Sequence, residues 1–441
     1  MTSKQNTQHK DVEKFIKDAL DSLPSKTPIL QKRLLKLLGS ELTSGDLDLF
    51  EKSVLIDASL AHWDMAKNRK QGQPEIQIYC PNIEEGHNSK TVIDIVSDDY
   101  SFLVDSVVAE INKNNMLIDL LLHPILYVEY DSKGEMKNAQ RERDDKLTRQ
   151  SHIHVQIKDT LSPETLKSLE KGLYTALEDV FYANRDWRKM LEELRLAKEE
   201  LANAPLKQPL REIEKYCSFL EYIADNNFTL LGYRHYEFKD TKNGIVSKTV
   251  KGEGLGLLAD DVKPAYISEN EEGLPRNLQE LRKRLDPVSI SKTNRISTVH
   301  RRVPMDAIAV KTYNHKGEVT GEKLFVGLFT SVTYSRSASS VPYIREKVED
   351  VLHVSGFLPM SHDGKALRHI LEKYPRDELF QIETKDLYKT ALDILKLQER
   401  QRIALFLRED PFGRYISCLV YVPRDRFGTD LREQIIKILE D

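Results

Sequence analysis

With 441 residues, the chain is longer than one hydrophobic core usually organises, so its length predicts about two to four domains. Its 66 basic and 70 acidic side chains leave a formal net charge of -4, which gives no strong field to attract nucleic acid or anionic lipid. The longest apolar runs, such as residues 117–125, fall short of the roughly 20 apolar residues of a membrane span, and residues 1–10 lack the apolar segment of a secretory signal. We therefore expect a cytoplasmic protein with no nucleic-acid partner and no membrane partner.

The three cysteines, Cys80, Cys217 and Cys418, are widely spaced and form no CxxC motif or Cys/His pair. This usage fits a reducing compartment and gives no sign of a structural metal. We expect three buried, unreactive thiols.

Residues 1–66 are expected to form a polar N-terminal tail followed by helices. Leu30, Leu34 and Leu38 recur at helical spacing, which predicts an amphipathic helix in this segment. After residue 70 the hydrophobic period changes from helical to alternating.

Residues 70–185 carry the pattern of a first ACT-like domain. The predicted order is a strand at 91–97, a helix at 99–114, strands at 118–130 and 151–158, and a helix that begins at Pro163. Pro124 is expected at a bulge or a sheet edge, because it cannot donate a backbone hydrogen bond. This order matches the ferredoxin-like βαββαβ pattern, except that the final strand is missing. We expect residues 75–80 to supply it, because Ile76 and Ile78 alternate as in a strand that can pair with 91–97.

The middle of the chain predicts a helical connector at 187–225, a sheet-rich domain at 226–335 and a second helical connector at 341–375. Prolines at 205 and 209 break the first connector, and Gly356, Pro359 and Gly364 interrupt the second. Strands are expected at 228–238, 245–250, 296–302, 306–313 and 322–334.

Residues 376–441 repeat the earlier order and predict a second ACT-like domain, truncated before its last strand. The expected elements are strands at 378–382, 403–408 and 415–422, a helix at 385–399, and a helix from Thr429 whose Leu431, Ile435, Ile438 and Leu439 face a core. The predicted fold class is therefore α+β, with ACT-like modules joined by helical connectors and a sheet-rich middle domain.

Several stretches resemble the amino-terminal region of the bacterial large-class NAD-dependent glutamate dehydrogenases, in the same order along the chain. They are AHWDMAKNR (61–69), DDYSFLVDSV (98–107), LLHPILYVEYD (121–131), FTLLGYRHYEF (228–238), STVHRRVPMDAIAVK (297–311), GLFTSVTYSRS (327–337), SHDGKALRHILEKYPRDELFQI (361–382) and LQERQRIALFLREDPFGRYISCLVYVPRDR (397–426). The resemblance implies ACT-like modules, a catalytic domain far downstream, and oxidative deamination of L-glutamate to 2-oxoglutarate with NAD. It also implies a homo-oligomer that responds to an amino acid effector.

The residues predict no catalytic residue and no cofactor site in this segment, and the resemblance implies that NAD binds in the downstream domain of the parent enzyme. A dinucleotide site requires GxGxxG between a strand and a helix. Gly252, Gly254 and Gly256 give GxGxG in a β-rich region instead, which predicts a turn or bulge. The sequence also shows no Lys/Asp pair in a glycine-rich setting that could act on the α-carbon of an amino acid.

Asp98, Asp99 and Ser101 lie between the first strand and helix of the first ACT-like domain, and they form the candidate effector site. Backbone N–H groups at a helix start can hold a carboxylate. The structural alternative is that the acidic residues complement the helix dipole.

Arg295, His300, Arg301 and Arg302, together with Lys292, form the densest cationic run and a candidate anion site. The alternatives are a solvated strand end and an interdomain salt-bridge face.

Two histidine motifs receive structural interpretations. His152 and His154 share one face of a strand, but no matching carboxylate or cysteine is nearby in the sequence, so we expect ordinary sheet residues and no metal. His362, Asp363 and Lys365 could suggest acid/base chemistry, but the glycine between them favours a turn.

Two other functions remain open: a stand-alone amino-acid-sensing ACT protein, and a scaffold whose ACT-like sheets only pair with one another. A self-contained sensor would be expected to close its last sheet.

Overall fold

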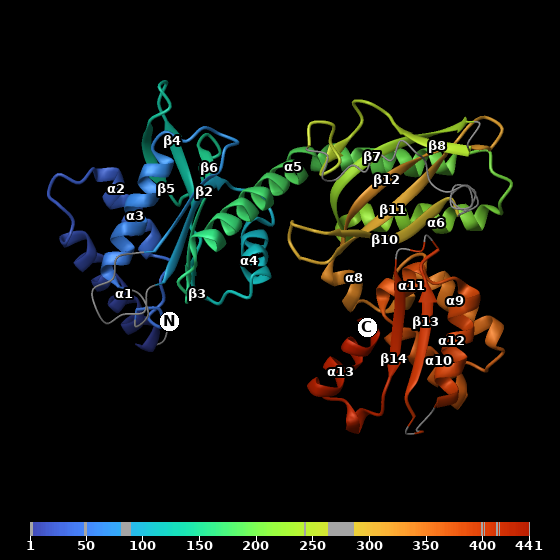
Figure 1. The fold of residues 1–441 in the computed structure, drawn as a ribbon. Helices are drawn as coiled ribbons and strands as arrows, with labels where there is room; N and C mark the ends of the chain where they lie inside the picture. Colours follow the sequence, from blue (N-terminus) through green and yellow to red (C-terminus); the bar gives the residue numbers. More distant parts are fainter. Residues whose placement is uncertain are drawn as a thin grey trace. The chain divides into compact units, whose positions relative to one another are not determined.

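The computed structural model describes residues 3–47, 51–80, 90–241, 244–262, 286–397, 400, 402–411, 413 and 415–440. Helices and antiparallel sheets alternate along the chain, which is the expected α+β class (Figure 1). The chain divides into two compact units. Unit 1 comprises Met1–Arg185 with Ser297–Val303, and unit 2 comprises Asp186–Ile296 with Pro304–Asp441. Among the described residues, no helix is both long and apolar enough to cross a bilayer.

Unit 1 opens with three helices, α1 (Ser3–Asp21), α2 (Ile29–Gly39) and α3 (Lys52–Ala66). Ile16 and Ala19 of α1 are buried in one cluster with residues of α2 and α3. The polar N-terminal tail of the prediction therefore contains helix α1, which packs on α2 and α3 through residues such as Ile16 and Ala19.

The sheet of unit 1 has the strand order that the ferredoxin-like pattern requires. Its strands are β1 (Glu75–Tyr79), β2 (Thr91–Asp98), β3 (Ile118–Leu122), β4 (Ile125–Tyr130), β5 (Met136–Gln140) and β6 (Thr148–Ile157). The order is β1-β2-β6-β4-β5, and β3 also pairs with β6. The predicted pairing of residues 75–80 with 91–97 is confirmed, because β1 lies antiparallel to β2 with Ile76 opposite Ile95.

Helices cover both faces of this sheet. α2 and α3 lie on one side, and α4 (Leu103–Lys113) and the first part of α5 (Pro163–Ala202) lie on the other (Figure 1). Every residue of β2 is buried, as expected for a strand that is covered on both faces.

Unit 2 is built on a second antiparallel sheet, of order β10-β11-β12-β7-β8, with β9 paired to β7. Its strands are β7 (Phe228–Thr241), β8 (Gly244–Thr249), β9 (Leu255–Gly256), β10 (Val288–Ile296), β11 (Pro304–Tyr313) and β12 (Val319–Phe329). The rest of α5 and helix α6 (Leu210–Tyr222) precede the sheet, and a π-helical turn (Ile223–Asn227) leads from α6 into β7.

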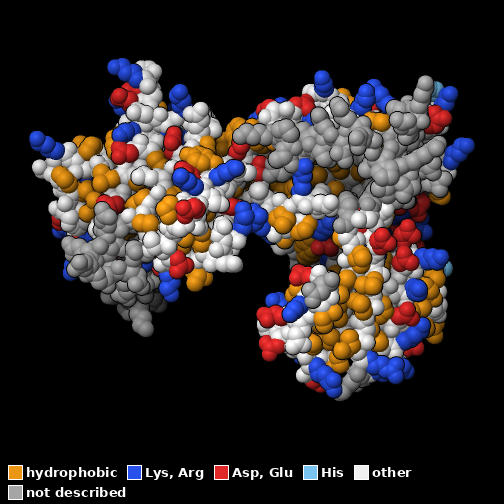
Figure 2. Space-filling model, viewed as in Figure 1, with side chains coloured by type: hydrophobic (Ala, Val, Ile, Leu, Met, Phe, Trp, Pro, Cys, Tyr) orange, Lys and Arg blue, Asp and Glu red, His pale blue; other side chains and the backbone are white. Residues whose placement is uncertain are grey.

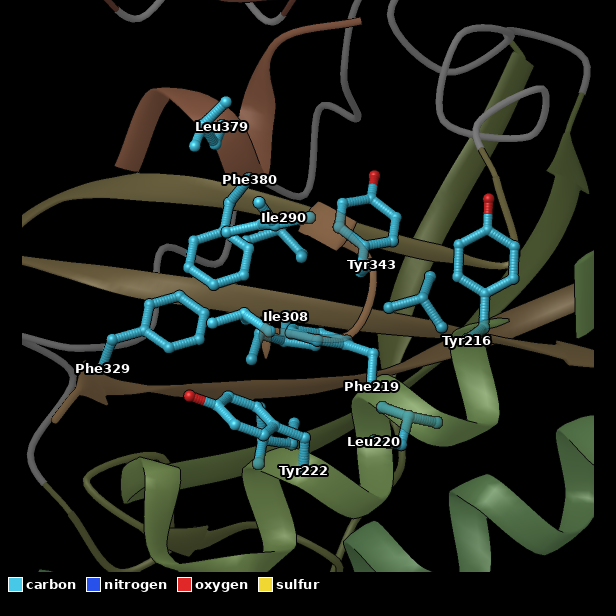
Figure 3. Packing of buried hydrophobic residues seen from close by; sticks show 14 of the residues in the cluster. Tyr216, Phe219, Leu220, Tyr222, Ile290, Ile308, Phe329, Tyr343, Leu379 and Phe380 are labelled. Carbon is cyan, nitrogen blue, oxygen red and sulfur yellow. The ribbon is translucent and has the colours of Figure 1, made fainter. Parts of the chain in front are cut away.

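The remaining helices of unit 2 are α8 (Ser331–Ser335), α9 (Ile344–Ser355), α10 (His362–Lys373), α11 (Arg376–Gln381) and α12 (Thr384–Leu397), with a short 3-10 turn at Ala338–Ser340. One continuous core joins them to α5, α6 and the sheet. Its centre is aromatic: Phe219 of α6, Phe329 of β12 and Phe380 of α11 meet there (Figure 3).

The strand predicted at 378–382 is wrong, because Arg376–Gln381 forms helix α11. Pro375 occupies the N-cap position, and Asp377 and Glu378 in the first turn complement the helix dipole. Leu379 and Phe380 are adjacent and both buried, which one turn of helix allows and a half-buried strand does not.

Two predictions for the first sheet also need correction. The single strand expected at 118–130 is interrupted at Pro124 and forms β3 and β4, which pair with different parts of β6. The charged segment after residue 130, for which no strand was predicted, contains β5, whose Met136 and Ala139 are buried against α2 and α3.

Further boundaries shift in the rest of the chain. The strand expected at 296–302 lies earlier, as β10, and Ser297–Val303 forms the connection to β11. The strand expected at 322–334 ends at Phe329, and α8 begins two residues later. Gly364 does not break a helix, because its backbone N–H donates to the Ser361 hydroxyl at the N-cap of α10. The division expected near residue 187 does not shift: the two units divide between Arg185 and Asp186, within α5, which is continuous over 40 residues.

The last elements are β13 (Ala404–Glu409), β14 (Ile416–Tyr421), a 3-10 turn (Arg424–Arg426) and α13 (Thr429–Glu440). β13 and β14 form a two-stranded sheet, and its outward face gathers hydrophobic side chains (Figure 2). Leu407 and Ile416 are each 62% exposed. The core contacts predicted for α13 are absent from the described structure, because this helix has no buried residue.

The cysteines are also less buried than expected. Cys80 and Cys217 are partly buried, and Cys418 is exposed on β14. The expectation of three buried thiols is therefore wrong.

Candidate functional site

The loop predicted to hold an effector carries two carboxylates that are already neutralised. Asp98, at the end of β2, accepts hydrogen bonds from the Arg69 guanidinium and from the backbone N–H of Gly72 at 2.7 Å. The Asp99 carboxylate lies 2.5 Å from Nη2 of Arg149. Burial raises the pKa of Asp99, with Arg149 opposing the shift. Both carboxylates therefore already pair with cationic side chains of the same chain.

Ser101 is exposed, and its backbone oxygen accepts a hydrogen bond of 3.2 Å from the Asn184 amide. The next residue, Phe102, has a φ of 69°, which places a large side chain in the left-handed region just before α4. The structure therefore places the three predicted residues together at the β2–α4 junction.

Acidic side chains of α4 pair with two members of the predicted cationic run. His300 Nδ1 lies 2.9 Å from the Asp105 carboxylate, and Arg302 Nη1 donates to Glu110 at 3.1 Å. His300, Arg301 and Arg302 belong to the Ser297–Val303 segment of unit 1, whereas Arg295 belongs to β10 of unit 2. Lys292 of β10 pairs with Asp306 at 2.7 Å.

The two remaining sequence motifs occupy structural positions. His362 and Asp363 form the exposed first turn of α10, so the turn expected there is a helix start. Gly252 and Gly256 have φ values of 83° and 60°, and the glycine segment leads into the short strand β9. Only a residue without a side chain fits at Gly256, because a Cβ would lie 2.3 Å from the Leu231 carbonyl oxygen.

His152 and His154 belong to a buried polar cluster in unit 1 that the sequence analysis did not foresee. Asp94 of β2 lies directly opposite His154 of β6, and His62 of α3 lies over both strands. The Asp94 Oδ1 atom is 2.6 Å from His154 Nδ1 and 3.1 Å from His62 Nε2. All four side chains are 0% exposed. The expectation that no carboxylate is near these histidines is therefore wrong.

The environment of the cluster favours an ionised carboxylate and neutral His152. Burial raises the pKa of Asp94, but His154 and His62 outweigh it, so its pKa lies below the usual range. Burial lowers the pKa of His152 well below its ordinary value, and His62 adds to the shift. A charged residue inside the apolar run TVIDIVS was the available sequence signal.

Unit 2 contains a polar cavity of about 370 Å³. Side chains of α6, β10, α9, the α11–α12 junction and the turn after β13 line it. Its charged lining residues are the basic Arg211, Lys215 and Lys347 and the acidic Glu212, Asp286, Glu346, Asp350, Glu383 and Asp410. Three bases face six acids, so the cavity favours a ligand that carries a cationic group.

Tyr343 and Lys347 are two buried residues of the lining of this cavity. Tyr343 has a φ of 73°, and its backbone N–H donates to the Glu346 carboxylate at 2.6 Å. The Lys347 ammonium donates to the carbonyl oxygens of Leu379, Phe380 and Ile382 at 2.8 to 3.1 Å, which satisfies the end of α11. A strained tyrosine held by its surroundings is typical of a ligand-binding position.

Sequence reasoning missed this cavity because its residues come from segments up to 200 positions apart. One signal was available. Lys347 interrupts the apolar stripe of Ile344, Val348 and Val351 on α9, which places a basic residue on the buried side of the helix.

Lys347 should make stability depend on pH. Burial lowers its pKa to about 7, with Asp286 opposing the shift, from an ordinary value of 10.5. Between these values the unfolded chain binds more protons than the folded chain, so stability rises with pH through this window. The wild type should gain about 2 kcal/mol relative to Lys347→Arg between about pH 6 and pH 9, measured by urea unfolding. Arginine stays charged throughout, and equal pH profiles for the two proteins would contradict the prediction.

The two sheets and the order of the helices define a multidomain α+β protein with an ACT-type sheet in unit 1. Residues 34–173 match the ACT1 domain of glutamate dehydrogenase, 341–400 match its helical motif 1, and 404–441 match its ACT2 domain. The chain belongs to the NAD-specific glutamate dehydrogenase family, as part of its amino-terminal region.

The relatives are longer proteins. The chain is 33% identical over 390 residues to an NAD-specific glutamate dehydrogenase of Halomonas elongata. The matched region is 87% of this chain and 24% of that protein. The NAD-specific glutamate dehydrogenase of Pseudomonas aeruginosa is 33% identical over 391 residues, with 88% and 24% covered. That of Mycobacterium tuberculosis is 27% identical over 395 residues, with 88% and 23% covered. The chain thus spans about a quarter of the length of these relatives.

Proposed function

We propose that this chain is the regulatory and assembly region of an enzyme that oxidatively deaminates L-glutamate to 2-oxoglutarate with NAD. The observation that carries this proposal is the order of ACT1, helical motif 1 and ACT2 along one chain. The dehydrogenase chemistry and the NAD site belong to a downstream domain in this proposal, because Gly252 lies in a turn and Gly256 in strand β9, which differs from the strand-to-helix loop of a nucleotide site.

The domain organisation that we propose keeps the boundaries predicted from the sequence, except that the second ACT-like domain begins where the match to the ACT2 domain begins. Helices at 1–66 and a first ACT-like domain at 70–185 precede the connector, the middle domain and the second helical connector, and the second ACT-like domain begins near residue 404. The parent enzyme is proposed to be a cytoplasmic homo-oligomer, with its own catalytic domain as the partner of this region.

The cavity of unit 2 is proposed as the effector site, with the 98–101 loop as the alternative position. An amino acid offers an ammonium and a carboxylate, and the cavity offers both kinds of partner. Arg211 and Lys215 can hold the carboxylate, while Asp350 and Glu383 can hold cationic groups. The excess of acidic groups favours a basic amino acid, so L-arginine is the probe of choice.

Calorimetry on the 441-residue chain should detect L-arginine binding and weaker binding of L-aspartate. The double substitution Asp350→Asn with Glu383→Gln should weaken arginine binding at least about tenfold, because two charge-assisted contacts are lost. Glu349→Gln is the matched control, since Glu349 is exposed on the same helix and does not line the cavity. Unchanged affinity in the double variant would move the effector site elsewhere.

Kinetics on the full-length enzyme test the function itself. Arginine should change its rate of glutamate-dependent NAD reduction, and the double substitution should remove that response. The isolated 441 residues should reduce no NAD. Turnover by the isolated chain would contradict a purely regulatory role, and a full-length enzyme without glutamate-dependent turnover would contradict the proposed reaction. In the second case the amino-acid sensor and the scaffold become the leading functions.

A further inference from the structure

Three side chains of types that bind metals converge in the interior of unit 1. They come from three elements: His62 from α3, Asp94 from β2 and His154 from β6. Each offers one ligand atom, and the three atoms lie within 4.8 Å of one another. From this geometry we propose that His62, Asp94 and His154 bind a divalent transition-metal ion, with zinc as the preferred ion.

The donor set suits zinc. Two imidazole nitrogens and one carboxylate oxygen are common zinc ligands, at about 2.0 to 2.2 Å from the ion. A tetrahedral site with such bonds separates its ligand atoms by about 3.3 Å. The distance between Asp94 Oδ1 and His62 Nε2 is already 3.1 Å. The distance between Asp94 Oδ1 and His154 Nδ1 is 2.6 Å, so this pair must open by about 0.7 Å.

Each proposed ligand has its own polar partner, as metal ligands in proteins usually do. Tyr79 donates to the second oxygen of Asp94 at 3.0 Å. His152 Nδ1 lies 3.3 Å from the second nitrogen of His62, and the Gln156 amide nitrogen lies 3.1 Å from the second nitrogen of His154. When Nδ1 of His154 binds a metal, its other nitrogen carries the proton, so the Gln156 amide must turn its oxygen to accept from it. These partners leave Oδ1 of Asp94, Nε2 of His62 and Nδ1 of His154 facing one another.

A further polar atom in this layer is unsatisfied. Nε2 of His152 is buried and has no hydrogen-bond partner among the described residues. An uncompensated buried polar atom costs free energy, so natural proteins keep such arrangements where another contribution offsets the cost. A divalent cation beside the buried Asp94 carboxylate would supply that contribution.

The test is zinc retention by the untagged protein, refolded with excess zinc and then dialysed against a weak chelator. Because the ligands are 0% exposed, the ion should enter during folding and leave slowly. Wild type should retain about one zinc per chain, and the His62→Gln, His154→Gln double variant should retain at least about tenfold less. His362→Gln is the control, since that imidazole is 90% exposed and lies in α10.

A measurement on the wild type alone covers the case in which the double variant fails to fold. Cobalt in place of zinc should give the intense visible absorption of a tetrahedral site, and X-ray absorption at the zinc edge should show two imidazoles. Failure of the wild type to retain zinc would overturn the proposal and leave a hydrogen-bonded network of structural histidines. Retention by the folded double variant, or an octahedral cobalt spectrum, would overturn it as well.

Discussion

Replacing Phe329 by alanine should destabilise unit 2 by about 3 to 5 kcal/mol. Phe329 is 0% exposed, and its ring stacks on Phe380 with centroids 4.1 Å apart and planes 3° apart (Figure 3). The ring also meets Phe228 edge-on at 5.1 Å. Its removal would leave a cavity between the sheet and α11, which rigid neighbours can fill only in part. Urea unfolding followed by circular dichroism measures the loss.

Phe427→Ala is the control for this substitution. Phe427 is 60% exposed, so its truncation should change stability little. Equal effects of the two substitutions would mean that the aromatic cluster does not organise the core of unit 2.

Breaking the buried ion pair between Lys311 and Glu322 should have a comparable effect. The two residues lie opposite each other on β11 and β12, with Nζ and Oε2 2.6 Å apart and side chains 1% and 2% exposed. Lys311→Met or Glu322→Leu alone removes the opposite charge from a buried ion pair, which costs about 3 to 5 kcal/mol. The free energy of unfolding of each single variant gives the measurement.

The double variant separates the pair from its surroundings. Combining Lys311→Met with Glu322→Leu should restore stability to within about 1 to 2 kcal/mol of the wild type, because both charges are removed together. Lys396→Met breaks an exposed pair with Asp393 and should have little effect. Additive losses in the double variant would show that the two side chains act independently.

Local patterns in the sequence were sufficient for most elements of unit 1. Ile76 and Ile78 alternate with more polar residues, and this period alone predicted the edge strand that pairs with β2. The short stretch 378–382 was ambiguous, because five residues do not distinguish one helical turn from a strand. Pro375 before an acidic pair was the signal for a helix start that should have decided it.

The candidate sites depend on pairings that no local pattern contains. Asp94 meets His154 across 60 positions because β2 and β6 pair in one register, and a shift by a single residue would turn the two side chains to opposite faces. The cavity depends on α11 ending where Lys347 can reach its carbonyl oxygens. The 98–101 loop was located correctly, but its pairing with Arg69 and Arg149 came from distant segments.

The polar layer beneath α3 has a consequence for how this helix is aligned on the sheet. His62 reaches Asp94, and Arg69, just beyond the helix, reaches Asp98 on the same strand. Sliding α3 by one turn would move both contacts by about 5.4 Å and leave buried polar groups without these hydrogen-bond partners. Apolar side chains tolerate such repacking at a lower cost in free energy. We infer that these contacts select a single alignment of α3 among several that hydrophobic packing alone would accept.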